Sequence, residues 1–427
     1  MTKTHPLGKA AFLLSLLALP LLGAGPAPDS DWSQWRGPKR DGISPDTGLL
    51  KEWPAGGPAL AWKTTGIGTG YATVTVLGDR LYTLGDSGDS SNLVAINLAD
   101  GKVLWTAPVG KPHTEGNKEW LGPRASPATD GKLVIALGAL GELVCVDLAG
   151  REKWRKNLHA DFDGQVGGWK YSESPLLDGE NVVVTPGGPK GSVLALKKET
   201  GEPVWRSSEI KDRAEYPSLM PVEIGGQPQY LLLTMQSVAG IAAASGKLLW
   251  RIDRPGKTAI IPTPIYKDGL VFVTSGYGVG CNLIKVTADG GTFKAEEVYS
   301  DEKAGVKTPE RTANHHGGMI LVGDHLYGTN EKMLRCVEMK TAKVVWENKC
   351  VGKGSIAYAD GHLVVRSESK NGEIALVEAS PAGYKESGRF KQPAFSGMPQ
   401  WPHPVIIGGR LYIRDEDTLY AYDVKAK

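Results

Sequence analysis

Apolar and polar residues alternate along this chain in short runs with a period of two residues. Such runs are typical of β-strands that bury one face. Most of them are bounded by Gly-Asp, Asp-Gly or Gly-Gly, which is the signature of tight hairpin turns. Clear examples are GDRLYTLG from Gly78, DGKLVIALG from Asp130, DGLVFVTSG from Asp268 and DGHLVVRSE from Asp360. The pattern predicts an all-β protein built from short antiparallel strands.

A second type of segment follows most of these hairpins. It contains a small residue in an alternating strand, then a tight turn, three further residues and a tryptophan. The copies end at Trp105, Trp154, Trp205, Trp250 and Trp346. The first three intervals are 45 to 51 residues, and the last is 96 residues, which spans two periods. A missing copy is therefore expected at 283–299, with Phe293 or Lys294 near the tryptophan position, and a degenerate copy is expected at 374–390.

Four short antiparallel strands repeated every 45 to 50 residues describe the blade of a β-propeller. The last unit, LYAYDVKAK, lacks an outer strand, and the segment GPALAWKTTG at 57–66 supplies a candidate, with Trp62 at the tryptophan position. We therefore predict an eight-bladed β-propeller whose last blade is completed by an N-terminal strand. This closure pairs two sheet edges that would otherwise be exposed. The expected organisation is a signal peptide at 1–25, a lead-in segment at 26–57 and the propeller at 58–427.

The repeated pattern, small-x-Asp-x-x-Thr-Gly-x-x-x-Trp, resembles the pyrroloquinoline-quinone-like (PQQ-like) repeat of β-propellers. The resemblance covers residues 58–427. That family includes quinoprotein alcohol dehydrogenases, a lipoprotein of the bacterial barrel-assembly machinery, and many exported proteins of unassigned role. The segments DWSQWRGPKRDG from Asp31, NHHGG from Asn314 and WPHP from Trp401 are similar to the last group. In the lead-in, Trp32, Trp35 and Trp53 are expected to cover one end of the ring.

The charge balance is nearly neutral, with 49 Lys and Arg against 47 Asp and Glu. Without a basic run the chain is not expected to bind nucleic acid. Charged residues Lys3 and Lys9 precede an uncharged run at 10–24 that is shorter than the ~20 residues of a membrane span. This layout favours a secretory signal over a membrane anchor. Since no cysteine follows the run for lipid attachment, a soluble periplasmic or secreted protein is expected.

The four cysteines do not form a metal-binding pattern, because none has C-x-x-C spacing. Cys145 and Cys336 align with small residues such as Ala95 and Ala195, so they are expected to be buried. Whether Cys281 and Cys350 form a disulfide stays open.

The connections from each outer strand to the next inner strand should converge at the hub of one face, where function is expected. Aromatic surfaces beside a few charged groups are suited to a flat or polar ligand, although they could also merely fill the channel. Since consecutive residues of a strand face opposite ways, at most one of His315 and His316 should line the hub. The candidate hub residues are Arg124, Trp169, Glu173, Tyr216, Tyr277, Asn314, His315, His316, Lys353, Trp401, His403 and Arg414.

Two functions are compatible with this face. The favoured hypothesis is a ligand- or protein-binding scaffold in the cell envelope that performs no turnover. The alternative is a PQQ-dependent alcohol or sugar dehydrogenase with Ca²⁺, in which Arg124, Lys353 and Trp401 hold the quinone and Glu173 or His315 acts as general base. The resemblance to the dehydrogenases implies a roof made by two adjacent cysteines, and this chain has no such pair. No metal site is assigned.

Overall fold

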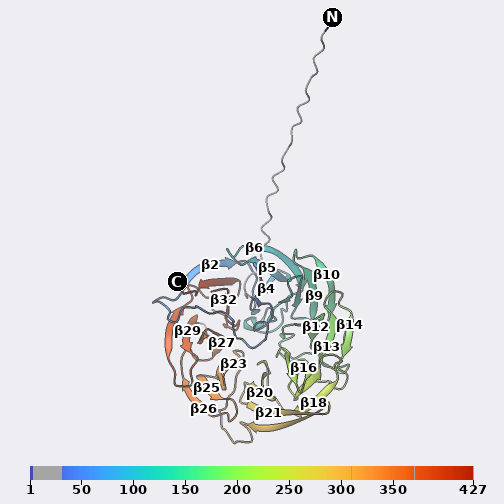
Figure 1. Cartoon of the computed structure of the whole chain (residues 1–427), viewed down its shortest axis with the longest axis vertical. Coiled ribbons are helices and arrows are strands. Elements are labelled where there is room, and N and C mark those ends of the chain that lie inside the picture. Colours follow the sequence, from blue (N-terminus) through green and yellow to red (C-terminus); the bar gives the residue numbers. More distant parts are fainter. Residues whose placement is uncertain (3–30, 309, 370, 427) are drawn as a thin grey trace.

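The computed structural model describes residues 1–2, 31–308, 310–369 and 371–426. Apart from its first two residues, the expected signal peptide at 1–25 lies outside these ranges. Eight antiparallel sheets follow one another around a ring in the order of the sequence (Figure 1). The predicted eight-bladed, all-β propeller is confirmed.

We number the blades in chain order and give their strands from the inner to the outer position. Blade 1 contains β3 (Thr75–Leu77), β4 (Arg80–Ser87), β5 (Ser90–Asn97) and β6 (Val103–Gly110), and blade 2 contains β7 (Ala128–Thr129), β8 (Leu133–Leu137), β9 (Glu142–Asp147) and β10 (Glu152–Asn157). Blade 3 contains β11 (Leu176–Asp178), β12 (Asn181–Val184), β13 (Leu194–Lys197) and β14 (Pro203–Arg206), and blade 4 contains β15 (Met220–Ile224), β16 (Gln227–Leu233), β17 (Ser237–Ala242) and β18 (Leu248–Asp253).

Blade 5 contains β19 (Ile265–Lys267), β20 (Leu270–Ser275), β21 (Gly280–Asp289) and β22 (Thr292–Ser300), and blade 6 contains β23 (Met319–Val322), β24 (His325–Thr329), β25 (Leu334–Glu338) and β26 (Val344–Asn348). Blade 7 contains β27 (Gly354–Ala359), β28 (His362–Ser367), β29 (Glu373–Glu378) and β30 (Glu386–Lys391), and blade 8 contains β31 (Val405–Ile407), β32 (Arg410–Asp415), β33 (Thr418–Asp423) and β2 (Ala59–Thr65). A 3₁₀ turn, Lys118–Trp120, is the only helical element in the described part of the chain.

The ring closes by pairing strands from the two ends of the chain. Strand β2 lies antiparallel to β33, with Ala59 opposite Asp423 and Trp62 opposite Ala421. In Figure 1 this N-terminal strand lies beside the C-terminal blade. The hydrophobic core lies between the faces of neighbouring blades, and each of its clusters includes side chains from more than one blade.

Neighbouring blades are joined by a repeated tryptophan contact. In five blades the indole of the outer strand donates a hydrogen bond to a backbone carbonyl at the turn of the next blade, whereas the Trp250 indole of blade 4 donates to Gln229 Oε1 of its own blade at 2.9 Å. The ring also stacks on that turn, so a Cβ at Gly150 or Gly201 would come within 3 Å of it. Both glycines have positive φ, so the turn needs glycine for backbone geometry as well. The hydrogen bonds are Trp62 to Leu98 (3.2 Å), Trp105 to Leu148 (3.0 Å), Trp154 to Lys198 (2.8 Å), Trp205 to Ala243 (3.0 Å) and Trp346 to Ser380 (2.8 Å).

Blade 5 corrects one sequence prediction. Tyr299, not Phe293 or Lys294, lies at the tryptophan position, opposite Leu283, and its hydroxyl donates to the Met339 carbonyl at 2.7 Å. The prediction was wrong because it placed the docking residue directly after the three residues that follow the turn, as in the other repeats. Strands β21 and β22 are 10 and 9 residues long, so their turn lies farther from the docking position than in the other blades.

The lead-in segment completes the contact between blades 7 and 8. Gly388 lies at the tryptophan position of blade 7, opposite Leu376, and a Cβ on it would lie 2.6 Å from the Cβ of Trp53. The backbone N–H of Leu50 donates to the Val424 carbonyl at 2.8 Å, which is the carbonyl that the other blades offer to an indole. Trp53 and Leu50 thus replace the missing outer-strand side chain.

The first part of the lead-in crosses the central channel. Strand β1 (Asp31–Trp32) pairs with β3 of blade 1. The Arg40 guanidinium donates to the Ser174 and Pro175 carbonyls of blade 3 at 2.9 and 3.1 Å. Arg36 donates to the Met319 carbonyl of blade 6. Because these bonds reach inner strands on different sides of the ring, residues 31–44 close the channel.

All four cysteines are free. Cys145 and Cys336 are buried opposite Trp154 and Trp346, as their place in the small-residue column predicts. Cys281 and Cys350, whose pairing the sequence leaves open, form no disulfide in the structure.

Replacing Trp53 tests the contribution of the lead-in to ring closure. Trp53 is 8% exposed and packs against Phe390, with ring centroids 5.3 Å apart. We expect Trp53→Ala to lower the free energy of unfolding by about 3 kcal/mol, because truncating a buried tryptophan typically costs that much. Chemical denaturation followed by circular dichroism measures the change. Phe395→Ala is the control, because Phe395 is 46% exposed; equal stability of the two variants would contradict the assignment.

Candidate functional site: an aromatic pocket at the hub

One structural position in each blade builds the wall of the hub. In each blade, one residue of the inner strand is in register with the outer-strand position that contacts the turn of the next blade, which we call the docking position. The wall residue lies four residues before that inner-strand residue. In blade 1, for example, Trp105 pairs with Ala95, then Tyr82, then Thr75, and Tyr71 lies four residues before Thr75. From blade 1 to blade 8 the position is held by Tyr71, Arg124, Ser172, Tyr216, Ile261, His316, Lys353 and Trp401. All except Lys353 line a pocket of about 180 Å³.

A second layer lies two residues farther along each blade. It is rich in hydroxyl groups, and these join neighbouring blades. Ser174 Oγ accepts from the Ser126 N–H at 2.9 Å, and Ser218 Oγ accepts from the Ser174 N–H at 2.9 Å. The position is held by Thr73, Ser126, Ser174, Ser218, Thr263, Gly318, Ser355 and His403.

The lead-in forms the floor of the pocket. The Trp35 indole donates to Thr263 Oγ1 at 3.1 Å and lies 4.7 Å from the His403 ring, centroid to centroid. Burial first, and then the charge of Arg36, lower the pKa of His403 to about 3. The imidazole is therefore neutral at physiological pH, and its Nε2 donates to the His316 carbonyl at 2.7 Å.

Arg124 is the central charge of the wall. Its guanidinium carbon lies 5.7 Å from the ring centroids of both Tyr71 and Trp401, which is cation–π distance. It donates to the backbone carbonyls of Trp120 and Trp169. Burial lowers the pKa of Arg124 to about 10, so the side chain stays charged at neutral pH. Among the described residues that line the pocket there is no Asp or Glu to balance this charge.

The aromatic side chains extend outward from the pocket to its rim. Trp169 meets Trp120 edge to face at 5.9 Å and Tyr216 edge to face at 6.0 Å. At the rim, Trp120 and Tyr277 are 42% and 36% exposed. A partner that approaches this face therefore meets aromatic surface before it reaches Arg124.

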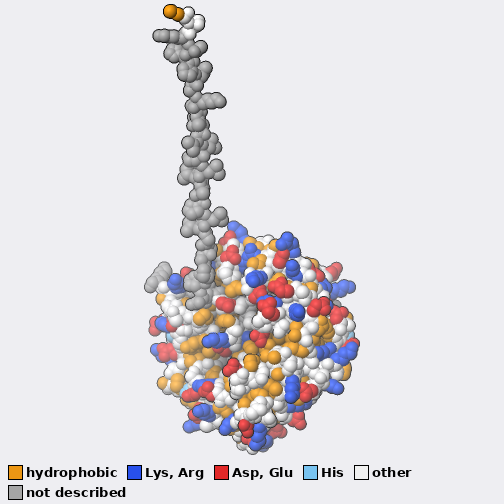
Figure 2. Space-filling model, turned by 45° about the vertical axis from the view of Figure 1, so that its right-hand side comes forward, with side chains coloured by type: hydrophobic (Ala, Val, Ile, Leu, Met, Phe, Trp, Pro, Cys, Tyr) orange, Lys and Arg blue, Asp and Glu red, His pale blue; other side chains and the backbone are white. Residues whose placement is uncertain are grey.

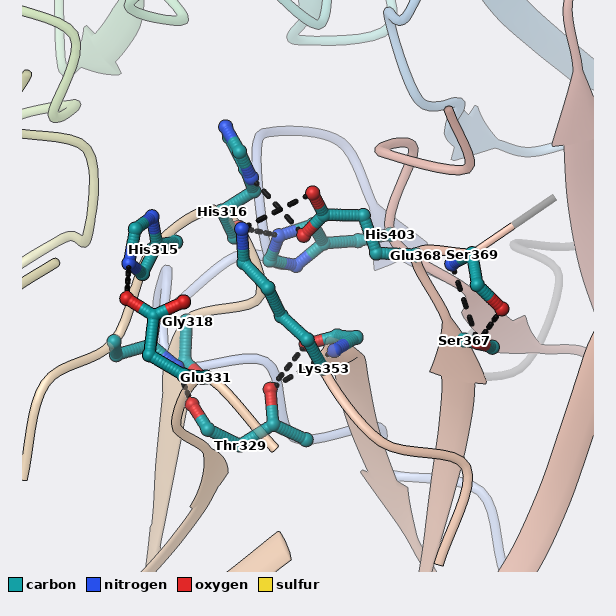
Figure 3. Close-up of polar contacts among 12 residues, drawn as sticks. His315, His316, Gly318, Thr329, Glu331, Lys353, Ser367, Glu368, Ser369 and His403 are labelled. Carbon is teal, nitrogen blue, oxygen red and sulfur yellow. Dashed lines mark hydrogen bonds and ion pairs between the residues drawn. The ribbon is translucent and has the colours of Figure 1, made fainter. Parts of the chain in front are cut away.

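An ion-pair network supports the wall on the side of blades 6 and 7. Glu368 accepts from His316 Nδ1 at 3.2 Å and from Lys353 Nζ at 3.1 Å (Figure 3). Burial disfavours the ionised carboxylate, but its bonds to His316 and Lys353 outweigh this effect and lower the pKa of Glu368 to about 2. The imidazole of His316 in turn stacks on Trp401 at 4.7 Å. Lys353 thus orients the wall through Glu368.

The structure brings seven of the twelve predicted hub residues to the pocket. They are Arg124, Trp169, Tyr216, Tyr277, His316, Trp401 and His403. His316 lines the pocket, whereas His315 turns to Glu331 (Figure 3), so one of the two histidines lines the hub as expected, although both lie in the loop before β23 and not on a strand.

The other predicted residues form hydrogen bonds within the propeller and do not line the pocket. Both carboxylate oxygens of Glu173 accept hydrogen bonds from Thr185. The Asn314 amide donates to the Gly318 and Thr329 carbonyls at 3.0 and 2.8 Å. Arg414 is fully buried and donates to blade 1, including the Ala72 carbonyl at 2.9 Å. None of these three side chains, nor His315 or Lys353, is among the described residues that line the pocket.

Sequence reasoning missed Tyr71 as a wall residue and did not place Trp35 and Arg36 at the floor. A signal for Tyr71 is present in the chain. The wall residue is followed two positions later by Ser or Thr in most blades, as in Tyr71-Ala72-Thr73 and Arg124-Ala125-Ser126. The floor has no comparable signal, because it comes from a segment outside the repeats.

The pocket does not fit a calcium-bound quinone. Ca²⁺ binds oxygen ligands, carboxylates above all, and none of the described lining residues supplies a carboxylate. Within the described part of the chain, no group of three His, Cys, Asp or Glu side chains is placed to hold a metal ion. The two residues considered as general base, Glu173 and His315, are turned away from the pocket.

The fold and the hub together define a tryptophan-docked, eight-bladed propeller with a blind aromatic pocket. A family model described as outer membrane protein assembly factor BamB matches residues 89–348. The chain belongs to this family, and its resemblance to PQQ-like repeat propellers is confirmed.

Individual relatives agree with this assignment. The outer membrane protein assembly factor BamB of Alkalilimnicola ehrlichii is 29% identical over 213 residues, which are 49% of this chain and 50% of the relative. BamB of Bordetella pertussis is 28% identical over 240 residues, 55% and 53% of the two chains. The chain thus spans about half the length of these relatives. A quinoprotein ethanol dehydrogenase of Pseudomonas aeruginosa is 24% identical over 164 residues, 38% of this chain and 26% of that enzyme.

Solved structures share the fold. BamB from Moraxella catarrhalis superposes with a TM-score of 0.57 at 13% identity and covers 86% of this chain and 99% of its own. The quinohemoprotein alcohol dehydrogenase ADHIIG from Pseudomonas putida HK5 superposes with a TM-score of 0.52 at 12% identity, covering 93% of this chain and 81% of its own. At these identities the likeness concerns the fold alone.

The pH dependence of stability tests the environment of Glu173. Burial raises its pKa from 4.5 to about 7. The folded state therefore holds the proton more tightly than the unfolded state, so this group's contribution to stability is complete below pH 4.5 and is lost as the pH rises to about 7. Glu173→Gln cannot ionise, and between pH 5 and 8 its free energy of unfolding should rise relative to wild type by up to about 3 kcal/mol.

Urea denaturation at several pH values measures this difference. Glu199→Gln, at an exposed position, is the matched control and should follow wild type at every pH. Parallel curves for wild type and Glu173→Gln would contradict the raised pKa.

Proposed function

We propose that this protein is an exported scaffold of the cell envelope, which binds another protein at its hub face and receives an apolar group of that partner in the pocket. The observation that carries the proposal is the lining itself, in which seven tyrosine and tryptophan side chains surround Arg124 and Arg36 and no described lining residue is acidic. Such a lining binds an apolar group that lies next to a negative charge.

The exposed aromatics support a protein partner. Trp120 and Tyr277 lie at the pocket rim with 42% and 36% of their surface exposed. Aromatic and arginine side chains beside a concave pocket are the residues that most often dominate protein interfaces. The remaining surface in view mixes Lys and Arg with Asp and Glu (Figure 2), which agrees with the near-neutral charge and with a partner other than nucleic acid.

Membership of a family described by outer membrane protein assembly, together with the predicted signal peptide, supports a place in the periplasm or at the cell surface. In the described part of the chain, no helix has the length and apolar character to cross a bilayer. The dehydrogenase alternative would require a calcium ligand set, and the described lining residues include no carboxylate; neither Glu173 nor His315, the two residues considered as its base, is among them.

Site-specific photocrosslinking tests the proposal. A photoreactive residue at position 120 or 277, in a cell that exports the chain, should give one defined protein adduct. The same residue at Val345, 40% exposed on outer strand β26, is the control and should not give it. Equal labelling from all three positions, or no adduct from the hub face, would contradict a hub-face partner.

Substitutions at the pocket give a second measure once the adduct is identified. We expect Trp120→Ala and Arg124→Gln each to weaken binding of the purified partner about tenfold or more, since central aromatic and arginine anchors typically contribute above 1 kcal/mol. Phe395→Ala is the matched control, because Phe395 is an exposed aromatic that does not line the pocket. Isothermal titration calorimetry measures these affinities. If Trp120→Ala bound the partner with wild-type affinity, this would contradict contact of the partner with Trp120 at the edge of the hub pocket.

A further inference from the structure

A second hollow shares one lining residue, Tyr216, with the hub pocket. It measures about 200 Å³ and lies between the loops of blades 3 and 4; we call it the rim pocket. The rim pocket is lined by Gly167, Gly168, Arg213, Glu215, Tyr216, Met235, Gln236 and Thr258.

Glu215 is the unusual group of this pocket. It is 7% exposed, and its Oε2 has no hydrogen-bond partner among the described residues. Burial raises the pKa of Glu215 to about 7, and the charge of Arg213 opposes this rise. A buried carboxyl group without donors is costly and needs a specific explanation.

The neighbouring groups do not satisfy this carboxyl group. Arg213, on the same loop, donates to the Val166 carbonyl at 2.9 Å. The Tyr216 hydroxyl accepts from the Trp169 N–H at 3.2 Å. From blade 4, the groups that line the pocket are the neutral side chains of Met235, Gln236 and Thr258. A positively charged donor from outside the chain would supply what Glu215 lacks.

Gly167 keeps this space open. A Cβ at this position would collide with the Tyr216 hydroxyl and lie 3.5 Å from Glu215 Oε2. The φ of Gly167 is not positive, so its backbone conformation does not require glycine. Glycine is needed here only for space next to the carboxyl group and the phenol.

We propose that the rim pocket binds a basic side chain, with the Glu215 carboxylate as its counter-ion. The proposal rests on the scaffold function only for the origin of that side chain, which would belong to the partner at the hub face. Arg124 in the hub pocket has no acidic group among the described lining residues, whereas the rim pocket holds the Glu215 carboxyl group beside Arg213, and both pockets share Tyr216. A matching partner segment carries an acidic and a basic group that flank a large apolar side chain.

A small probe tests the site without the partner. Nα-acetyl-lysine N-methylamide is titrated into the full chain and its binding is followed by ligand-observed NMR. We expect saturable binding, at least tenfold weaker for Glu215→Gln and for Gly167→Ala. The norleucine analogue, which lacks the ammonium group, should not bind. Equal binding of both probes, or unchanged binding to Glu215→Gln, would overturn the proposal.

Two further measurements do not depend on whether Glu215→Gln and Gly167→Ala fold. Arg213→Gln removes the cation that favours ionised Glu215, so the pH at which probe affinity increases should shift upward relative to the wild type, and an unshifted profile would overturn the role of Glu215. In the wild type, affinity should increase from pH 6 to pH 8 as Glu215 ionises, and a flat profile would overturn the proposal. If the lysine probe fails while the crosslink at position 120 persists, the basic subsite is wrong and the scaffold function stands. If the probe binds and the crosslink is absent, the basic subsite stands and the scaffold function is wrong.

Discussion

The contact between an outer-strand aromatic side chain and the turn of the next blade is the interaction on which the rest of the structure depends. In six of the eight blades the contact includes a hydrogen bond from the aromatic side chain to a turn carbonyl of the next blade, and in several the ring stacks on a turn glycine. It fixes the position of one blade relative to the next. Since each wall residue lies four residues before the inner-strand residue in register with this aromatic row, the same contact also makes Tyr71, Arg124 and Trp401 converge on one pocket.

The lead-in connects closure of the ring with formation of the site. Its second half, through Leu50 and Trp53, fills the one interface whose outer strand carries glycine at the docking position. Its first half crosses the channel and places Trp35 and Arg36 beneath the pocket. A single segment therefore completes the interface between blades 7 and 8 and also lines the pocket.

The fold was predictable because the same pattern of strands, turns and tryptophan recurs in several repeats. Five tryptophans in register reveal the blade, and Trp62 reveals the closure. Tyr299 was missed because a long hairpin changes the count from the turn while leaving the strand register intact.

The pocket was predictable only in part, because the sequence does not show which polar groups are already used. Arg124 and Arg414 look alike as loop arginines. Arg414, however, donates its hydrogen bonds to backbone carbonyls near blade 1, such as that of Ala72, which is more than 300 residues away in sequence. Glu173 and Glu215 differ in the same way, since Thr185 satisfies the first and the described residues leave an oxygen of the second without a partner.

A buried charge without a counter-ion weakens a fold, and a ring braced by docked aromatics is able to tolerate several such groups near its axis. The propeller satisfies most of them internally, as Glu368 is satisfied by His316 and Lys353. Arg124 and Glu215 have opposite charges and lie near the same tyrosine, yet they line separate hollows and do not pair with each other. Simple stability would favour joining or removing them. Their placement in two hollows that share Tyr216 is what a surface needs if it is to distinguish the order of charges along a bound segment.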